Sequence, residues 1–386
     1  MDTTVAPVDM VSNPPAKKPD HDRMIRQEMR LTRSWWSRIA ILAYVVAALV
    51  IPLELTDSLW LSLLTSGAVY GMGALGINVL NGYAGHASLG QAFFVSAGAF
   101  VAVQTGDKWG WPLPLWLLAA AVVGGALGAL VVPLAMRLRG IYEIILTLGL
   151  VYIGTYIFTN WTSLTGGSTG VPAQMKLSLG FIDFGHMIIG GELYTYEQGV
   201  LMLSMLLVGL CVLIVCNVMR SRTGRAIVAS RDGALAVEIL GASPTRTKLA
   251  TYVMSGALAG LCGAMLAAQL QYVNEDQFNL QLSVQFIVMM IVGGAATAWG
   301  PVIGALIVSA LPLYITTYAS DIPFVKQPTD SGFGIMPGQL SLVVYGLLLA
   351  VFLVLQPSGL VGLAKSVSAL VGRVVRRSRS AAASEG

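Results

Sequence analysis

Two long apolar stretches of the chain are separated by the run Asn81-Gly82-Tyr83-Ala84-Gly85-His86-Ala87-Ser88-Leu89-Gly90-Gln91. This run is too polar and too rich in glycine for a helix that faces lipid. Irregular backbone at membrane depth is tolerated only against protein or a water-filled cavity. Two interpretations stay open: a broken helix that lines a path through a membrane, which we prefer, and a plain cytoplasmic turn.

The composition of the 386-residue chain supports a membrane setting for this run. Hydrophobic residues make up 55% of the chain and charged residues 11%, whereas charged residues make up about 25% of a typical soluble domain. The three cysteines, Cys211, Cys216 and Cys262, lie in apolar runs without the close pairs or neighbouring histidines of a zinc site. The composition therefore excludes a soluble domain and predicts an all-α polytopic membrane protein without a metal site.

Ten segments are long and apolar enough to cross a membrane as helices, which takes roughly 20 apolar residues each. We predict about ten transmembrane helices, at 39–55, 59–80, 87–104, 113–136, 141–159, 198–219, 249–272, 283–299, 301–319 and 339–356. The transmembrane domain then covers 39–363. A basic arm (1–38), which we expect to be disordered, precedes it, and a basic tail (364–386) follows it.

The basic residues predict the orientation of these spans. With a cytoplasmic N-terminus, 20 of the 23 lysines and arginines fall on the cytoplasmic side, and only Lys108, Lys176 and Lys326 fall outside. Both termini are therefore predicted to be cytoplasmic. The 220–248 loop lies inside, and the 160–197 loop lies outside as a folded cap.

Charged residues are nearly absent from the predicted spans. Glu54 lies at an outer end, and Glu143 lies one turn from Arg139, with which it can pair. A proton-coupled carrier normally needs a titratable group at mid-depth. The chain also lacks the phosphate-binding loop of an ATPase. We therefore expect its energy source to be another protein, unless it conducts passively.

Glycines recur within the spans at a spacing of four residues. Gly71-x-Gly73-x-x-Gly76 matches the dinucleotide-binding pattern but lies inside an apolar helix with no preceding strand. We interpret these glycines as sites of close helix contact. The other pairs with this spacing are Gly67/Gly71, Gly124/Gly128, Gly256/Gly260 and Gly300/Gly304.

A second glycine-rich interruption runs from Gly293-Gly294 to Trp299-Gly300-Pro301. Together with the first run it suggests a path lined by broken helices. Five spans on each side of the 160–197 loop would also suit an inverted repeat, although the two interruptions do not fall at matching spans. The candidate pathway residues are Asn78, Asn81, Tyr83, His86, Ser88, Gln91, Thr147, Gln285, Gly293 and Gly294. For the polar ones, an interhelical hydrogen bond is the alternative role.

The cytoplasmic loop carries a third unusual pattern. From Ala226 to Leu240 it predicts one helix with Ile227, Leu235 and Ile239 on its apolar side and Gly241 as a stop. Such a helix can dock into a partner protein or lie on the membrane as an interfacial anchor. Its small residues favour a protein groove, whereas the basic residues of the loop favour the membrane surface.

These three regions resemble the permease subunits of branched-chain amino acid ABC transporters, LivM type. The resemblance runs over roughly residues 60–363 and rests on several motifs in order. The matching stretches are Gly82–Gly90, Arg137–Tyr142, Asn160–Gly167, Ser221–Ala226, Arg231-Asp232, Leu240-Gly241, Gly293-Gly294, Trp299–Val302 and Gln356–Leu363.

The resemblance implies a subunit of the transport path in a prokaryotic cell membrane, not an enzyme. It implies two cytoplasmic ATPase subunits that hold ATP and Mg, a second homologous permease and an extracytoplasmic solute-binding protein, with no cofactor in this chain and no nucleic-acid partner. The outer acids and the 160–197 loop would receive the binding protein. The coupling residues would be Arg222, Gly224, Arg225, Arg231, Asp232, Ala236, Glu238 and Gly241.

The sequence departs from the family pattern at two places. Glu143 replaces the aromatic or aliphatic residue usual in the family, and His86 and Gln91 stand in exchanged positions relative to the family pattern. The solute therefore stays open between hydrophobic amino acids, urea, short amides and other small solutes. An ion-coupled carrier or channel acting alone, and a membrane enzyme, are the alternatives from other classes.

Overall fold

The computed structural model describes residues 35–138, 140–179, 182–185, 188–189 and 192–317, with the short stretches 339–340, 343–347, 350–351 and 359–360. The chain divides into two compact units, 1–44 and 45–386. Most of the predicted arm, the predicted tail and much of the predicted span 339–356 lie outside the described residues.

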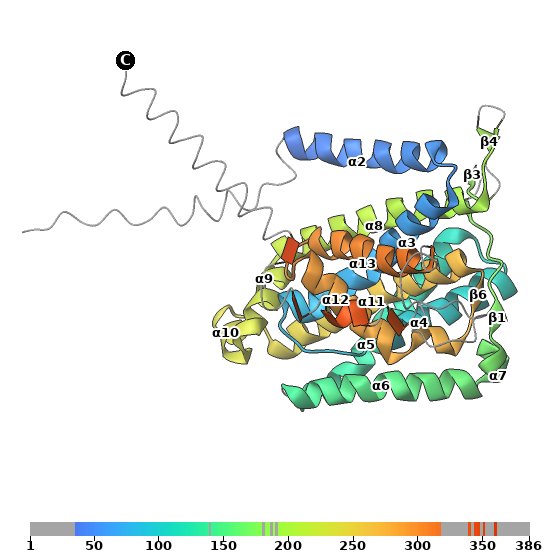
Figure 1. Ribbon diagram of the computed structural model, residues 1–386. Coiled ribbons are helices and arrows are strands. Elements are labelled where there is room, and N and C mark those ends of the chain that lie inside the picture. The colour runs from blue at the N-terminus through green and yellow to red at the C-terminus, as the bar shows by residue number, and fades with distance from the viewer. Residues whose placement is uncertain are drawn as a thin grey trace, which may run out of the picture. The chain divides into compact units, whose positions relative to one another are not determined.

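Helices make up nearly all of the described part of the second unit (Figure 1). Helix α2 (Trp35–Glu54) begins in the first unit and ends in the second. The other helices are α3 (Ser58–Ile77), α4 (Gln91–Ala102), α5 (Leu113–Ala135), α6 (Ile141–Asn160), α7 (Thr162–Thr165), α8 (Tyr196–Arg220), α9 (Arg222–Ala229), α10 (Ala234–Ile239), α11 (Pro244–Leu270), α12 (Leu280–Gly293) and α13 (Gly300–Thr317).

Five helical stretches in the described part of the chain are long and apolar enough to cross a membrane. They are Ser58–Tyr83, Leu113–Ala135, Ile141–Asn160, Tyr196–Arg220 and Pro244–Leu270. Each coincides with a predicted span to within a few residues, so the prediction of an all-α membrane protein is confirmed at this level. Helices α12 and α13 are apolar but shorter.

Two predicted spans differ from the helices observed. The span 87–104 begins as a helix only at Gln91, because residues 84–90 are not helical. The span 283–299 ends as a helix at Gly293, because Gly294 takes a φ of 123° that ordinary helical residues do not adopt. Both differences fall at the glycine-rich runs, where hydropathy continues but the helix does not.

Short strands occur mainly in the 160–197 loop. Strand β1 (Val171–Pro172) pairs with β6 (Tyr272–Val273), which follows α11, and so ties this loop to the helical bundle. The remaining described strands form two antiparallel pairs, β2 (Ser178–Leu179) with β3 (Ile182–Asp183) and β4 (Ile188–Ile189) with β5 (Glu192–Leu193).

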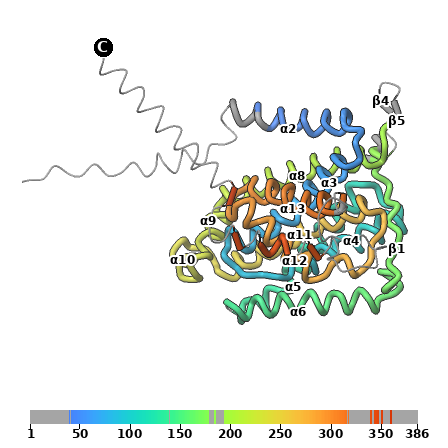
Figure 2. The backbone as a smooth tube through the Cα atoms, viewed as in Figure 1, coloured from blue at the N-terminus to red at the C-terminus, as the bar shows by residue number. Residues whose placement is uncertain are grey.

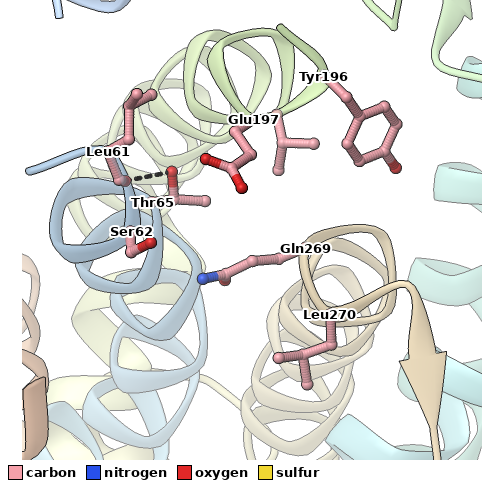
Figure 3. A pocket seen from close by; sticks show the side chains of 8 residues that line it. Leu61, Ser62, Thr65, Tyr196, Glu197, Gln269 and Leu270 are labelled. Atoms are coloured by element: carbon pink, nitrogen blue, oxygen red, sulfur yellow. Dashed lines mark hydrogen bonds between the residues drawn. The ribbon is translucent and has the colours of Figure 1, made fainter. Parts of the chain in front are cut away.

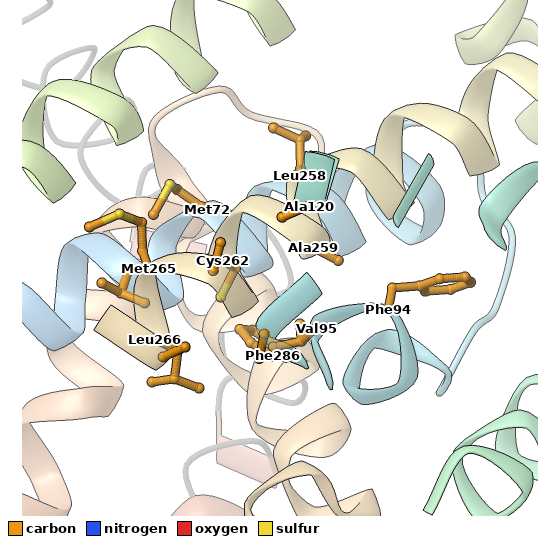
Figure 4. Packing of buried hydrophobic residues seen from close by; sticks show 14 of the residues in the cluster. Met72, Phe94, Val95, Ala120, Leu258, Ala259, Cys262, Met265, Leu266 and Phe286 are labelled. Carbon is orange, nitrogen blue, oxygen red and sulfur yellow. The ribbon is translucent and has the colours of Figure 1, made fainter. Parts of the chain in front are cut away.

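Helix α11 occupies the centre of the hydrophobic core. It packs against α3, α4 and α5, and α13 packs against α3 and α12. The path of the chain through these helices can be followed in Figure 2. Buried side chains from α3, α4, α11 and α12 meet there, among them Met72, Val95, Cys262 and Phe286 (Figure 4). This buried core forms because small residues let several helices approach α11 at once.

Glycines form the closest of these helix contacts, as the four-residue spacing predicts. A Cβ on Gly124 of α5 would lie 2.3 Å from the carbonyl oxygen of Gly256 of α11, and a Cβ on Gly256 would lie 2.2 Å from that of Gly124. Gly293 and Gly304 make a similar crossing between α12 and α13. Distances below 3.0 Å leave no room for any side chain, so these backbones can approach only as glycines.

Replacing Gly124 by Ala should therefore destabilise the protein. The added methyl group has to displace the backbone of α11, which costs about 1–3 kcal/mol, as overpacking of a core does. Thermal unfolding of the detergent-solubilised protein measures the effect. Gly149→Ala is the matched control, since nothing lies within 4 Å of its Cβ position. Equal melting temperatures for the two variants would contradict the crossing.

Candidate functional site

The connection between α3 and α4 forms the centre of the candidate site. Helix α3 runs into a π-helical turn at Asn78–Tyr83, and the following residues 84–90 are not helical. We call these residues the 84–90 segment. Gly85 has a φ of 72° and is exposed, as is Ala87, whereas Ser88 and Gly90 are buried. The segment thus lies with one side against the bundle and the other side open.

Asn78 joins this connection to the second glycine-rich run. Its side chain is fully buried. Nδ2 donates to the carbonyl oxygen of Thr297 at 2.8 Å, and Oδ1 accepts from the backbone N–H of Ala296 at 2.8 Å. The two runs that the sequence marks as unusual are therefore in direct contact, although more than 200 residues separate them.

Side chains from other helices complete the start of α4. The backbone N–H of Leu89 donates to Thr147 Oγ1 at 3.0 Å, and that of Ala92 donates to Ser283 Oγ at 3.0 Å. Asn81 bonds to the backbone of Ser88 through both ends of its amide. The first turn of a helix leaves N–H groups without helical partners, and here the chain supplies the acceptors.

The predicted pathway residues all lie near these two runs or on the helices beside them. Gln91 donates to the carbonyl oxygen of Gly73 at 2.9 Å and lies 3.4 Å from Ser255 Oγ. Hydrogen bonding, the alternative role considered from the sequence, thus describes Asn78, Gln91 and Thr147. The buried members are Asn78, Ser88, Gln91, Thr147, Gly293 and Gly294, and the half-buried members are Asn81, Tyr83, His86 and Gln285.

Replacing Asn78 by Ala should destabilise the protein even when no solute is present. The change leaves the N–H of Ala296 and the carbonyl group of Thr297, both in half-buried residues, without these partners, which costs about 1–2 kcal/mol. Thermal unfolding in detergent again measures this loss. Asn217→Ala, at an exposed position of α8, is the control and should leave the melting temperature unchanged. A stable Asn78→Ala protein would show that the contact between the two runs is dispensable.

The predicted helix from Ala226 to Leu240 is wrong. Helix α9 ends at Ala229, residues Ser230–Asp232 form a single 3-10 turn, and α10 begins after Gly233, whose φ of 116° excludes a continuous helix. Gly241 ends α10 with a φ of 71°, as predicted. The three apolar residues also do not share one face, because Ile227 is fully buried while Leu235 and Ile239 are 71% and 78% exposed.

The predicted coupling residues lie on α9, on the 3-10 turn, on α10 and at Gly241 just after it, and one of them is buried. Gly224 is buried, and a Cβ there would lie 2.3 Å from the Cα of Met219. Ala236 is half-buried, and the exposed residues are Arg222, Arg225, Arg231, Asp232, Glu238 and Gly241. Leu240 is 59% exposed, so α10 ends in an apolar surface of Leu235, Ile239 and Leu240.

This region touches the start of the 84–90 segment, at Ala84, which is buried, and at Gly85, which is exposed. Ser230 Oγ donates to the carbonyl oxygen of Ile227 at 2.6 Å and lies 3.2 Å from the carbonyl oxygen of Ala84. A Cβ on Gly85 would lie 2.8 Å from Arg231 Cγ. The candidate docking surface and the interrupted helix are therefore in direct contact.

A buried ion pair lies on the inner side of the same segment. Glu143, at the start of α6, is only 4% exposed. Its Oε1 accepts a hydrogen bond from the Tyr252 hydroxyl at 2.6 Å and lies 3.1 Å from Lys248 Nζ and 3.4 Å from His86 Nδ1. We call these four residues the Glu143 cluster. Arg139, the partner expected from the sequence, lies outside the described residues.

Sequence reasoning missed several members of this site. Lys248, Tyr252, Ser230 and Ser283 were not singled out. Lys248 did carry a signal, because it is a cation at the start of a predicted span and so within reach of Glu143 near the same membrane face. Ser283 carried none, since its contact with Ala92 depends on how distant helices pack.

A small cavity lies at the other ends of the helices. It measures about 190 Å³ and is lined by Leu61, Ser62, Thr65, Tyr196, Glu197, Val200, Gln269 and Leu270. The carboxylate of Glu197 points toward the space between α3 and α11 (Figure 3). The lining combines apolar groups with hydrogen-bond acceptors. In the described part of the chain, no group of three or more histidines, cysteines or acids is placed to hold a metal ion.

Packed apolar helices, interrupted next to an exposed polar loop, define a helical integral membrane protein. The family model for the permease component of branched-chain amino acid transport systems matches residues 59–353. The chain belongs to this family, as its motifs predict.

Individual relatives agree with this assignment. The high-affinity branched-chain amino acid transport system permease protein LivM of Salmonella typhimurium is 29% identical over 256 residues, which cover 63% of this chain and 60% of that protein. LivH of Escherichia coli K12, a permease protein of the same kind of system, is 26% identical over 266 residues, or 66% of this chain and 84% of that protein.

The chain is also similar to a protein with another named role. The autoinducer 2 import system permease protein LsrC of an Enterobacter species is 27% identical over 221 residues, covering 56% of this chain and 58% of that protein. The chain spans about three fifths of the length of the LivM relatives it matches. No solved structure matches the chain.

Proposed function

We propose that this chain is the transmembrane permease subunit of an ATP-driven importer and forms the translocation pathway for branched-chain or other hydrophobic amino acids. The family and the names of the LivM and LivH relatives support the solute class. The proposed coupling to an ATPase is supported by the contact of Ser230 and Arg231 with the 84–90 segment. This contact connects an exposed surface to an interrupted helix.

The membrane arrangement in this proposal has ten spans, with both termini in the cytoplasm of a prokaryote. The transmembrane domain covers 39–363, with the arm 1–38 and the tail 364–386 on the inner side. The bias of lysine and arginine toward one side supports this orientation. The 220–248 loop then faces the cytoplasm, and the cavity that contains Glu197 faces outward.

The partners follow from this orientation. Two cytoplasmic ATPase subunits, which hold ATP and Mg, would receive the apolar surface of Leu235, Ile239 and Leu240 in a groove. The exposed charges around it, Arg231, Asp232 and Glu238 among them, would set its register. A second, homologous permease and an extracytoplasmic binding protein complete the importer. The binding protein would dock on the 160–197 loop.

Transport would then be a switch between an outward-open and an inward-open path. Movement of the ATPase subunits would displace α9 and α10 as a unit. Through Ser230 and Arg231 this movement would reach the 84–90 segment, and through Asn78 it would reach residues 294–299. Rigid bodies that repack at an interface are a common way to make such a switch.

The apolar surface of α10 gives the most direct test of the proposed partner. Replacing both Leu235 and Ile239 by Ser should remove the contact with the ATPase while leaving the fold intact, because both side chains are largely exposed. We expect the tagged wild-type chain, gently solubilised from its native host, to co-purify with an ATPase and a second permease. The double variant should lose most of the ATPase.

Leu270→Ser is the matched control, since Leu270 is 45% exposed at the opposite end of α11. It should retain the ATPase. A wild-type chain that purifies alone, even after crosslinking, would contradict the proposed function and favour a carrier or channel that acts by itself.

The solute is tested by uptake into cells. Deletion of the gene should lower uptake of radiolabelled leucine, and unlabelled isoleucine and valine should compete with leucine in the wild type. The relative with an autoinducer 2 import name makes a different small solute the runner-up. Unchanged leucine uptake in the deletion strain, with loss of urea or short-amide uptake, would replace the amino acid by that solute.

A further inference from the structure

The Glu143 cluster joins two helices, α6 and α11, to the 84–90 segment at one carboxylate oxygen. Glu143 belongs to α6, Lys248 and Tyr252 belong to α11, and His86 belongs to the 84–90 segment. Lys248 Nζ also donates to the carbonyl oxygen of Ala135 at the end of α5, at 2.7 Å. The contact between His86 and Glu143 thus connects the 84–90 segment to α6 directly, and to α11 and α5 through Lys248.

Stability alone does not explain why a charged pair, Glu143 with Lys248, is buried at this position. Burial of a carboxylate and an ammonium group is costly, and well-packed apolar groups of similar volume often serve stability equally well. Glu143 is nonetheless nearly inaccessible and is paired with Lys248. A buried pair is better explained where a contact has to form and break at a defined position.

The geometry makes one of the three contacts separable. Lys248 and Tyr252 both belong to α11 and lie closest to Glu143 Oε1, at 3.1 Å and 2.6 Å. His86 lies farthest away, at 3.4 Å, and belongs to the 84–90 segment, which has an exposed side. Because Lys248 already balances the charge of Glu143, His86 can leave without creating an unpaired buried charge.

The 84–90 segment lies between this cluster and the surface assigned to the ATPase. Ala84 and Gly85 contact Ser230 and Arg231, and His86, the next residue, contacts Glu143. A displacement of α9 and α10 therefore acts on a short run of residues whose other side is held by Glu143. The same run leads directly into α4 at Gln91.

We propose that Glu143 is a positioning residue that holds the 84–90 segment against α6 and α11, and that transport requires the contact between His86 and Glu143 to open and close. This inference rests on the proposed function. It assigns to Glu143 and Lys248 the role of a fixed anchor and to His86 the role of the movable part. The anchor determines how far movement of α9 and α10 reaches α4.

The test uses the complex that co-purifies with the full chain, reconstituted in vesicles with its binding protein and with leucine as the probe. Two variants weaken the contact from different sides: Glu143→Gln, which removes the charge, and His86→Ala, which keeps the pair of Glu143 with Lys248. We expect each to raise the ATP hydrolysed per leucine imported by about tenfold, within the range typical of coupling between sites. Glu54→Gln, an exposed carboxylate on α2, should leave that ratio unchanged.

A merely structural role would lower the amount of complex and its melting temperature but would leave the ratio near the wild-type value. His86→Ala keeps the buried charge balanced, so it remains informative if Glu143→Gln does not fold. The pair Glu143→Leu with Lys248→Met removes both charges with similar volume. A wild-type ratio in His86→Ala, or in the folded double variant, overturns the inference while leaving the proposed function intact. A wild-type complex without leucine-dependent ATP hydrolysis contradicts the proposed function instead.

A second measurement follows the movement itself. A Cβ on Gly85 would lie 3.3 Å from Arg231 Cβ, close to the separation of about 3.5–4.5 Å that a disulfide needs. We expect Gly85→Cys with Arg231→Cys to crosslink without nucleotide, and to block leucine uptake until reductant is added. Ala84→Cys with Ser230→Cys is the alternative pair, since Gly85 has a φ of 72°. Full uptake by the crosslinked protein would show that this contact does not transmit the movement.

Discussion

Backbone polar groups at the interrupted helices must find partners within the chain, and this requirement shapes the rest of the site. In an apolar surrounding no water replaces a missing hydrogen bond, so irregular backbone persists only where other parts of the protein satisfy it. Asn78 satisfies Ala296 and Thr297, and Thr147 and Ser283 satisfy the start of α4. Each of these side chains comes from another part of the sequence. The interruptions are therefore fixed by the packing of the whole bundle as well as by local hydrogen bonds such as those of Asn81 with Ser88.

That packing depends in turn on glycines. Gly124 and Gly256 bring α5 and α11 into backbone contact, and Gly293 and Gly304 do the same for α12 and α13. Backbones that touch directly have few alternative arrangements at the same distance, because any shift along the helix brings larger side chains into the crossing. The helices that cross at glycines are thus expected to move together as rigid units.

The sequence predicts the helices better than their interruptions. Long apolar runs specified α3, α5, α6, α8 and α11 closely, because hydropathy over 20 residues is a strong signal. The glycine spacing likewise indicated the helix crossings. The helix predicted from Ala226 to Leu240 failed at Gly233, because its apolar pattern continues past a residue that takes a positive φ. The contacts of Asn78 and Glu143 could not be predicted, because they join residues whose proximity depends on the assembled bundle.

The closely packed helices and the hydrogen-bonded interruptions restrict where a conformational change can occur. The glycine crossings hold the inner layers through direct backbone contacts, and the fully buried Asn78 side chain joins the two interrupted runs through two hydrogen bonds. The contacts on the two sides of the 84–90 segment are of a different kind: single side-chain interactions of Ser230 and His86, next to exposed residues. A contact of this kind can open without unpairing any buried charge, because Lys248 stays with Glu143. The movable boundary of the bundle is therefore expected to run along the 84–90 segment, between helices that are packed too closely to rearrange and a surface that is free to follow a partner.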